Sequence, residues 1–351
     1  MTTTDLGLPG PGGLAGVPTS DEPQKAKDYK SDQEVRWCPG CGDYVVLNAV
    51  QSFLPSLGLK RENIVFISGI GCSSRFPYYM NTYGMHSIHG RAPAIATGLA
   101  VARPDLSVWV VTGDGDALSI GGNHLIHTLR RNVNLKILLF NNRIYGLTKG
   151  QYSPTSEEGK VTKSTPFGSL DHPFNPVSLA LGAEATFVGR AVDSDRAGLT
   201  EVLRQAAEHR GSALVEIYQN CPIFNDGAFD VLKDADEASR RIINVVDGQP
   251  ITFGGGDYAV VRDGFGLAVA KTAEVAESDV VVHDASDLNL AFALSRLSTQ
   301  DLQHTVTGVF RNVGRTTYDD AARAQVAEAE AAKPADLAAL LHGKDTWTVV
   351  G

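Results

Sequence analysis

The chain has 351 residues, with 31 basic and 40 acidic side chains and a formal net charge of −9 at pH 7. This charge argues against a general nucleic-acid binder, and no apolar run approaches the roughly 20 residues that cross a membrane. The N-terminus lacks the basic and apolar segments of a secretory signal, so we expect a cytoplasmic protein whose four cysteines are thiols rather than two disulfides.

The first 28 residues are rich in glycine and proline and contain few large apolar side chains. A segment of this composition buries too little apolar surface to offset the entropy of ordering. We therefore expect a disordered N-terminal arm over residues 1–28.

Two cysteines follow this arm. Cys38 and Cys41 flank a Pro-Gly pair, and such a tight turn points both sulfurs toward one ion. A CxxC motif fits a redox dithiol, a zinc site or an iron–sulfur site. A redox dithiol needs a βαβ unit just upstream, where the chain offers only polar residues. A helix is predicted after the turn, because Asp43 is a good N-cap and apolar residues recur at helical spacing over 45–54.

A third cysteine follows the short apolar run 64–68, which predicts a buried strand. Cys72 lies in the glycine-containing turn after this run, and ligands bind at the carboxyl ends of strands in open α/β sheets. The alternative is a buried structural cysteine. Further on, His86 and His89 are three residues apart, which also fits zinc, but no further ligand set accompanies them. We expect one of these histidines to contact a cofactor.

The central motif joins two apolar runs. The first, 107–112, ends in Gly-Asp-Gly-Asp at 113–116, and the second, 135–140, ends in Asn-Asn. Between Gly115 and Asn142 lie 26 residues, the length of one helix and one strand. A strand–helix–strand unit of this length brings both motif ends to the same edge of the sheet.

The residue types at that edge indicate a metal–diphosphate site. Asp114 supplies an anionic oxygen and Asn142 an amide oxygen, and such ligands suit Mg²⁺ that also binds phosphate oxygens. Gly113 and Gly115 let the backbone approach a phosphate closely. The N-terminus of the following helix adds free N–H groups.

The rest of the chain extends the alternation of strands and helices. It predicts a long polar loop over 149–173, and helices and strands over 176–181, 186–189, 196–208 and 212–218. Cys221 lies just beyond the last strand. The alternation predicts a doubly wound, mostly parallel α/β sheet over residues 29–225. Residues 226–351 are less regular, with short strands near 251–253 and 280–283 and a helix over 318–340. We expect an irregular extension there that packs on a metal site or a partner.

A family resemblance now becomes specific. GDG followed by NN at this spacing is the thiamine diphosphate motif, and the continuation YGLTKGQ with SPT over 145–155 resembles the β subunits of 2-oxoacid:ferredoxin oxidoreductases. The alternative, a nucleotide-binding turn of another doubly wound fold, does not account for this continuation. The resemblance implies the thiamine diphosphate-binding fold, and the LTK form of the loop is similar to that of 2-oxoglutarate enzymes.

The resemblance also implies cofactors and the residues that bind them. The WCPGCG, GCS and NCP contexts resemble the [4Fe–4S] ligands of the family, which assigns that role to Cys38, Cys41, Cys72 and Cys221. Mg²⁺ would be held by Asp114, Asn142 and the backbone carbonyl of Ile144. The residues expected to bind thiamine diphosphate are Gly71, Cys72, Ser73, His89, Gly113, Asp114, Gly115, Asp116, Asn142, Ile144, Gly146, Leu147 and Thr148.

The implied activity is the CoA-dependent oxidative decarboxylation of a 2-oxoacid, with electrons passed to ferredoxin. His89 belongs to a family-like HGR segment, and Lys149 is a candidate partner for a second substrate carboxylate. No glutamate in the chain can be singled out to bind the aminopyrimidine, so we expect activity only with an α subunit, in an α2β2 assembly. The alternatives are a non-redox decarboxylase or carboligase with a Cys₄ zinc site, and a non-catalytic iron–sulfur carrier.

Overall fold

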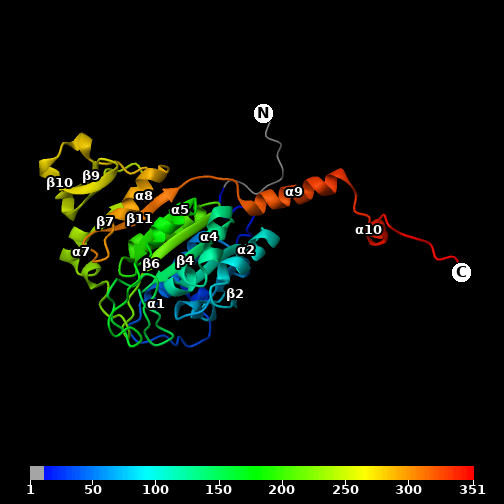
Figure 1. The fold of residues 1–351 in the computed structure, drawn as a ribbon, viewed down its shortest axis with the longest axis horizontal. Coiled ribbons are helices and arrows are strands. Elements are labelled where there is room, and N and C mark those ends of the chain that lie inside the picture. The colour runs from blue at the N-terminus through cyan, green and yellow to red at the C-terminus, as the bar shows by residue number, and fades with distance from the viewer. Residues whose placement is uncertain (1–11) are drawn as a thin grey trace.

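The computed structural model describes residues 12–351, and its centre is an eight-stranded sheet (Figure 1). The strand order is β2-β1-β3-β4-β6-β5-β11-β7, and neighbouring strands are parallel except β5 and β11. The predicted mostly parallel α/β sheet is thereby confirmed. The strands span Ile64–Ser68 (β1), Tyr83–His86 (β2), Ser107–Gly113 (β3), Leu135–Asn141 (β4), Phe187–Val192 (β5), Ser212–Tyr218 (β6), Ile242–Val245 (β7) and Thr305–Asn312 (β11).

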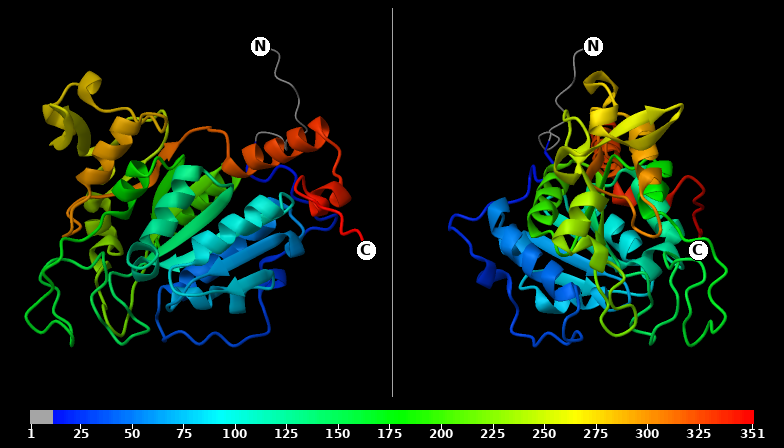
Figure 2. Two further views of the ribbon diagram at one scale, coloured as in Figure 1. Left: turned by 45° about the vertical axis from the view of Figure 1, so that its right-hand side comes forward. Right: turned by 90° about the vertical axis from the view of Figure 1, so that its left-hand side faces the viewer.

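Helices cover both faces of this sheet (Figure 2). The apolar sides of α2, α4, α5 and α8 pack on one face, and those of α1 and α6 pack on the other. The central strands are therefore buried on both sides, which explains why β1, β3 and β4 are nearly continuous apolar runs. The helices span Asp43–Phe53 (α1), Ala92–Ala102 (α2), Gly122–Arg131 (α4), Pro176–Gly182 (α5), Arg196–Glu208 (α6) and Leu288–Leu297 (α8).

The helix predicted after the GDG motif is interrupted. A short helix α3 (Asp114–Leu118) ends at Ser119, whose φ and ψ of −91° and −106° are not helical, and α4 begins at Gly122. A Cβ atom at Gly121 would lie 2.4 Å from the carbonyl oxygen of Asp116, so the break needs glycine. The free N–H groups expected at the start of a full helix therefore belong to a five-residue helix.

Residues 226–351 contribute strands to the main sheet and form a second, smaller sheet. Strand β11 lies between β5 and β7 in the main sheet, and a separate three-stranded antiparallel sheet is formed by β8, β9 and β10. The strand expected at 280–283 is reduced to isolated bridges at Val280 and Val282. The remaining elements span Ala235–Arg241 (α7), Thr252–Phe253 (β8), Tyr258–Asp263 (β9) and Gly266–Lys271 (β10).

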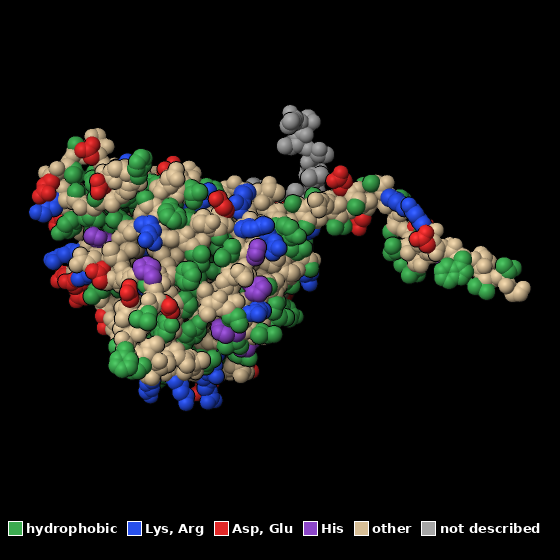
Figure 3. Space-filling view, viewed as in Figure 1, with side chains coloured by type: hydrophobic (Ala, Val, Ile, Leu, Met, Phe, Trp, Pro, Cys, Tyr) green, Lys and Arg blue, Asp and Glu red, His purple; other side chains and the backbone are tan. Residues whose placement is uncertain are grey.

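The helix expected over 318–340 is divided into α9 (Tyr318–Ala332) and α10 (Leu337–His342). Proline 334 lies between them, where it lacks the N–H that a continuous helix would use. Arg323 and Asp320 tie the start of α9 to the body. The end of the chain projects from the body as an arm with exposed apolar side chains on α10 (Figure 3).

Residues 12–28 differ from the disordered arm expected there. Gly13 donates its backbone N–H to the carbonyl oxygen of Glu208 at 2.8 Å, and Val17 is buried against the body. A short 3₁₀ turn, Ala26–Tyr29, then buries the Tyr29 ring completely. The first 11 residues of the expected arm lie outside the described residues. Over residues 12–351, no helix combines the length and the apolar character needed to cross a bilayer.

Candidate active site

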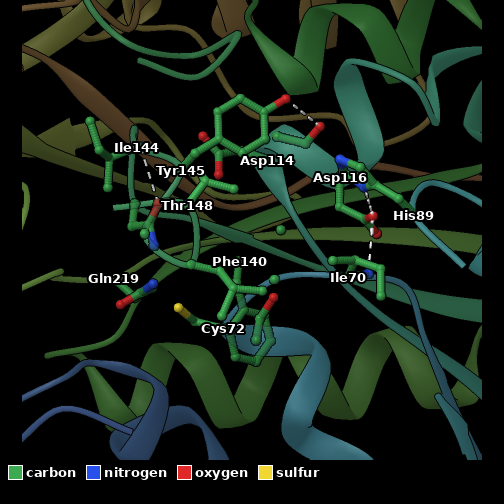
Figure 4. A pocket seen from close by; sticks show the side chains of 17 residues that line it. Ile70, Cys72, His89, Asp114, Asp116, Phe140, Ile144, Tyr145, Thr148 and Gln219 are labelled. Atoms are coloured by element: carbon green, nitrogen blue, oxygen red, sulfur yellow. Dashed lines mark hydrogen bonds and ion pairs between the residues drawn. The ribbon is translucent and has the colours of Figure 1, made fainter. Parts of the chain in front are cut away.

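Four neighbouring parallel strands end at one edge of the sheet. β1, β3, β4 and β6 lie side by side, so the residues that follow them converge there. Cys72 follows β1, Asp114 follows β3, Asn142 follows β4, and Gln219 follows β6. Together with their neighbours they surround a cavity of about 110 Å³ (Figure 4).

The cavity brings together all the residues that the sequence assigned to cofactor binding. They are Gly71, Cys72, Ser73, His89, Gly113, Asp114, Gly115, Asp116, Asn142, Ile144, Gly146, Leu147 and Thr148. Lys149 does not line it; this exposed residue follows directly on Thr148. Four further lining residues were not predicted, namely Ile70, Phe140, Tyr145 and Gln219. The position of Gln219 just beyond a strand that neighbours β4 is the signal that would have indicated it.

Asp114 is buried beside two hydroxyl groups. Its Oδ2 atom accepts hydrogen bonds from Ser153 Oγ at 2.5 Å and Thr155 Oγ1 at 2.6 Å. Burial raises the pKa of Asp114 to about 6, and these two hydrogen bonds oppose the rise. A bound cation would favour the charged carboxylate further, so this environment suits a metal ligand.

Asn142 sits in a tight turn at the end of β4. Its Oδ1 atom accepts the backbone N–H of Ile144 at 3.1 Å, and the preceding Asn141 Oδ1 accepts that of Arg143 at 3.1 Å. Arg143 has a φ of 55°, in the left-handed region that few residues with side chains adopt. The turn places an amide oxygen and the Ile144 backbone at the same cavity as Asp114. This all-oxygen donor set fits Mg²⁺.

The carboxylate of Asp116 accepts its hydrogen bonds from groups of the protein. Its Oδ1 atom accepts from His89 Nδ1 at 2.5 Å and from the backbone N–H groups of Ile70 and Gly90, and Thr112 donates its hydroxyl to Oδ2. The ring of His89 is thereby oriented with Nδ1 toward the carboxylate, and its other nitrogen is free to meet a ligand. Figure 4 shows this contact at one side of the cavity.

Gly115 has a steric role that the sequence did not indicate. A Cβ atom at this position would lie 2.1 Å from Cε1 of Tyr145, whose hydroxyl donates to the Gly115 carbonyl oxygen at 2.9 Å. The second glycine of the motif therefore makes room for an aromatic ring that lines the cavity. From the sequence alone, the expected role of this glycine is only to let a phosphate approach closely.

The four thiols gather beside the cavity. The Cys38–Cys41 turn is joined to the Cys72 segment by Trp37, whose Nε1 donates to the Cys72 carbonyl oxygen at 2.7 Å. The turn is also joined to the Cys221 segment. Gly42, which follows Cys41, donates its backbone N–H to the carbonyl oxygen of Asn220 at 3.0 Å. A Cβ atom on Gly146 would lie 3.3 Å from Cys72 Sγ and 3.8 Å from Cys221 Sγ.

All four cysteines are free, with Cys38 exposed and Cys41 and Cys221 buried. Burial raises the pKa of Cys72 to about 12, and burial also raises the pKa of Cys41 strongly. Iron or zinc would displace these protons, since thiolates are the ligands. Within residues 12–351, no three His, Cys, Asp or Glu side chains stand close enough to hold a single metal ion.

Known proteins resemble the chain at several levels. Residues 69–217 match the family described as thiamine pyrophosphate enzyme, C-terminal TPP binding domain. The 2-oxoglutarate oxidoreductase subunit KorB of Mycobacterium tuberculosis is 74% identical, covering 99% of this chain and 95% of its own length. A β subunit of 2-oxoacid:ferredoxin oxidoreductase 2 from Aeropyrum pernix is 44% identical, covering 57% of this chain and 64% of its own.

A solved structure extends the likeness to the fold. It is the 2-oxoglutarate:ferredoxin oxidoreductase from Magnetococcus marinus with 2-oxoglutarate, coenzyme A and succinyl-CoA bound, at 36% identity and a TM-score of 0.72. The match covers 92% of this chain and 96% of that one. The chain therefore belongs to the β subunits of the 2-oxoacid:ferredoxin oxidoreductases, in the branch of the KorB subunits.

Proposed function

We propose that this chain is the β subunit of a 2-oxoglutarate:ferredoxin oxidoreductase, which forms succinyl-CoA, CO₂ and reduced ferredoxin from 2-oxoglutarate and CoA. The observation that carries the proposal is the single sheet edge at which the GDG–NN cavity and the four thiols meet. Gly146 lines the cavity and also borders two of the sulfurs. A redox centre held by the thiols would therefore lie beside a cofactor in the cavity.

The residues of the cavity fit thiamine diphosphate with Mg²⁺. Asp114, Asn142 and the Ile144 carbonyl group would hold the cation, and Gly113 leaves space near Ser73 for a phosphate. When bound, thiamine diphosphate supplies an electron sink for the electrons released as a 2-oxoacid loses CO₂. Cys38, Cys41, Cys72 and Cys221 would hold the [4Fe–4S] cluster that passes single electrons to ferredoxin.

The chain's own residues prepare the cavity for this chemistry. Asp116 holds His89 at the rim, where its free nitrogen can donate to or accept from a substrate or cofactor oxygen. Phe140 and Ile144 are buried apolar walls that exclude water from one side of the cavity. Exclusion of water strengthens the electrostatic contacts made inside.

A partner chain is needed to complete the site. The only carboxylates among the residues lining the cavity are Asp114 and Asp116, and both are committed to the contacts above. No glutamate lines it within the described part of the chain. Leu147 lines the cavity and is an exposed apolar side chain, and so is Ile88, which precedes the lining residue His89 in the chain. We infer that an α subunit covers this rim and brings the missing glutamate, in an α2β2 assembly.

Lys149 is the candidate for substrate selection. It is exposed at the rim, and its φ of 74° shows that the loop holds it in an uncommon backbone conformation. A cation there can pair with the second carboxylate of 2-oxoglutarate, which pyruvate lacks. Lys149→Ala in the αβ complex should lower kcat/KM for 2-oxoglutarate and leave that for pyruvate unchanged. Lys163→Ala, an exposed lysine of the same loop, is the matched control.

Cofactor analysis of the purified complex tests the main proposal. A brown protein with about four irons per chain and bound thiamine diphosphate is expected. A colourless protein with zinc would favour a non-redox decarboxylase, and iron without thiamine would favour an electron carrier. Dye reduction driven by 2-oxoglutarate should require the α subunit. Full activity of the β chain alone would refute the shared site.

A further inference from the structure

One segment of the long loop after β4 turns inward toward the cavity wall. Ser153, Thr155 and Ser156 are each buried, although the loop over 149–173 is largely polar. None of the three lines the cavity itself. Their hydroxyl groups therefore contact the residues behind the site rather than a ligand within it.

The first set of contacts is to the GDG end of the motif. Ser153 and Thr155 both donate to Oδ2 of Asp114, at 2.5 Å and 2.6 Å. Two donors on one oxygen fix the rotation of the carboxylate plane. The remaining oxygen of Asp114 is thereby given a defined direction.

The second set of contacts is to the NN end. Thr155 Oγ1 lies 2.9 Å from Asn141 Oδ1, and Ser156 Oγ donates to the Arg143 carbonyl oxygen at 2.6 Å. Asn141 is itself fixed, because its amide donates to Glu216 Oε1 at 2.7 Å. Residues 153–156 therefore also form hydrogen bonds to the turn that carries Asn142.

Thr155 is the point at which the two ends meet. Its hydroxyl has one proton and two acceptors within reach, one on Asp114 and one on Asn141. Thr155 can donate its proton to Asp114 or to Asn141. In either case the Asp114 carboxylate still accepts a hydrogen bond from Ser153. The hydroxyl thus fixes the spacing between the two ends of the motif.

We propose that Ser153 and Thr155 are positioning residues for the divalent cation, which hold Asp114 and the Asn142 turn at ligand spacing without touching the cofactor. This inference rests on the proposed function, because it assumes that a cation accompanies the diphosphate. Groups that orient metal ligands from behind commonly change metal affinity by about 10–100-fold when removed.

The test is calorimetric titration of Mg²⁺ into the αβ complex in the presence of thiamine diphosphate. Thr155→Val removes the hydroxyl but keeps the shape, and should weaken Mg²⁺ binding about 10–100-fold. Thr155→Ser keeps the hydroxyl and should restore most of the affinity. Thr162→Val makes the same change elsewhere in the loop, where the hydroxyl bonds only to other loop residues, and should bind Mg²⁺ as the wild type does.

Thermal unfolding separates positioning from a purely structural role. A positioning role predicts that Thr155→Val chiefly reduces the rise in melting temperature caused by Mg²⁺ and thiamine diphosphate. Wild-type Mg²⁺ affinity in Thr155→Val, or a loss that Thr155→Ser does not restore, would overturn the inference. If Thr155→Val does not fold, Ser153→Ala serves as the test variant. The inference predicts that Ser153→Ala binds Mg²⁺ more weakly than the wild type, and unchanged binding would overturn it. If the wild type itself binds no Mg²⁺ with thiamine diphosphate, the proposed function fails instead.

Discussion

A buried ion pair stands behind the site and can be tested by substitution. Glu216 accepts from Arg190 Nε at 2.7 Å through one oxygen and from the Asn141 amide at 2.7 Å through the other. Both charged side chains are almost completely buried, at 1% and 0% exposure for Arg190 and Glu216. Removing one partner would leave the other charge buried without compensation, which costs about 3–5 kcal/mol.

Glu216→Gln should therefore destabilise the chain by about 3–5 kcal/mol, because its amide cannot satisfy both donors and the guanidinium stays charged. Arg190→Met should cost a similar amount. In the double variant R190M/E216Q no charge is buried, and the glutamine oxygen still accepts from Asn141. The double variant should be at least about 2 kcal/mol more stable than the sum of the single changes predicts.

Denaturant unfolding of the four proteins measures these differences. The thiamine diphosphate affinity of folded Glu216→Gln complex should fall as well, because Asn141 orients the turn that carries Asn142. Additive single and double changes, within about 0.5 kcal/mol, would refute the coupling. A stability of Glu216→Gln equal to that of the wild type would refute the buried charge itself.

Three further changes probe other parts of the molecule. Gly146→Ala would place a methyl carbon 3.3 Å from Cys72 Sγ, so iron measured per chain should fall several-fold, and full iron content would contradict a cluster at this position. Gly115→Ala would drive the Tyr145 ring into the cavity, and overpacking of about 1–3 kcal/mol predicts roughly 10–100-fold weaker thiamine diphosphate binding by calorimetry. Burial lowers the pKa of His209 from 6.5 to about 4, so the unfolded chain binds the extra proton between these values. Stability should therefore fall by roughly 3 kcal/mol as the pH drops from about 6.5 to 4, at 1.36 kcal/mol per pKa unit, and unfolding curves of His209→Gln should show a weaker pH dependence.

The sequence was sufficient to locate the cavity because its parts follow parallel strands. Apolar runs predict β1, β3, β4 and β6 locally, and in a parallel sheet of this kind the residues after them share one edge. Cys72, Asp114, Asn142 and Cys221 are close in space for this reason, although as many as 148 residues lie between them along the chain. The site could be predicted because the order of the parallel strands alone determines which residues meet at this edge.

The features that the sequence did not predict depend on contacts between residues that are far apart along the chain. Strand β11 pairs with β5 and β7, partners that a local pattern does not reveal, so residues 305–312 were not predicted to join the main sheet. The inward turn of Ser153 and Thr155 was missed for a related reason. Hydroxyl-rich segments are usually solvated, and this one is buried because its hydroxyls bond to Asp114 and to the Asn141–Arg143 turn, which a local pattern does not reveal.

The two aspartates of the GDGD turn look equivalent in sequence but act differently. They are two residues apart on α3, and on a helix such residues point about 200° apart. Asp114 faces the hydroxyls of the loop after β4, whereas Asp116 accepts four hydrogen bonds from His89, Ile70, Gly90 and Thr112. A carboxylate with four protein donors has little capacity left for a cation. Asp116 therefore shapes the site by fixing His89 and the turn before Cys72, and Asp114 is the aspartate that would bind the proposed metal.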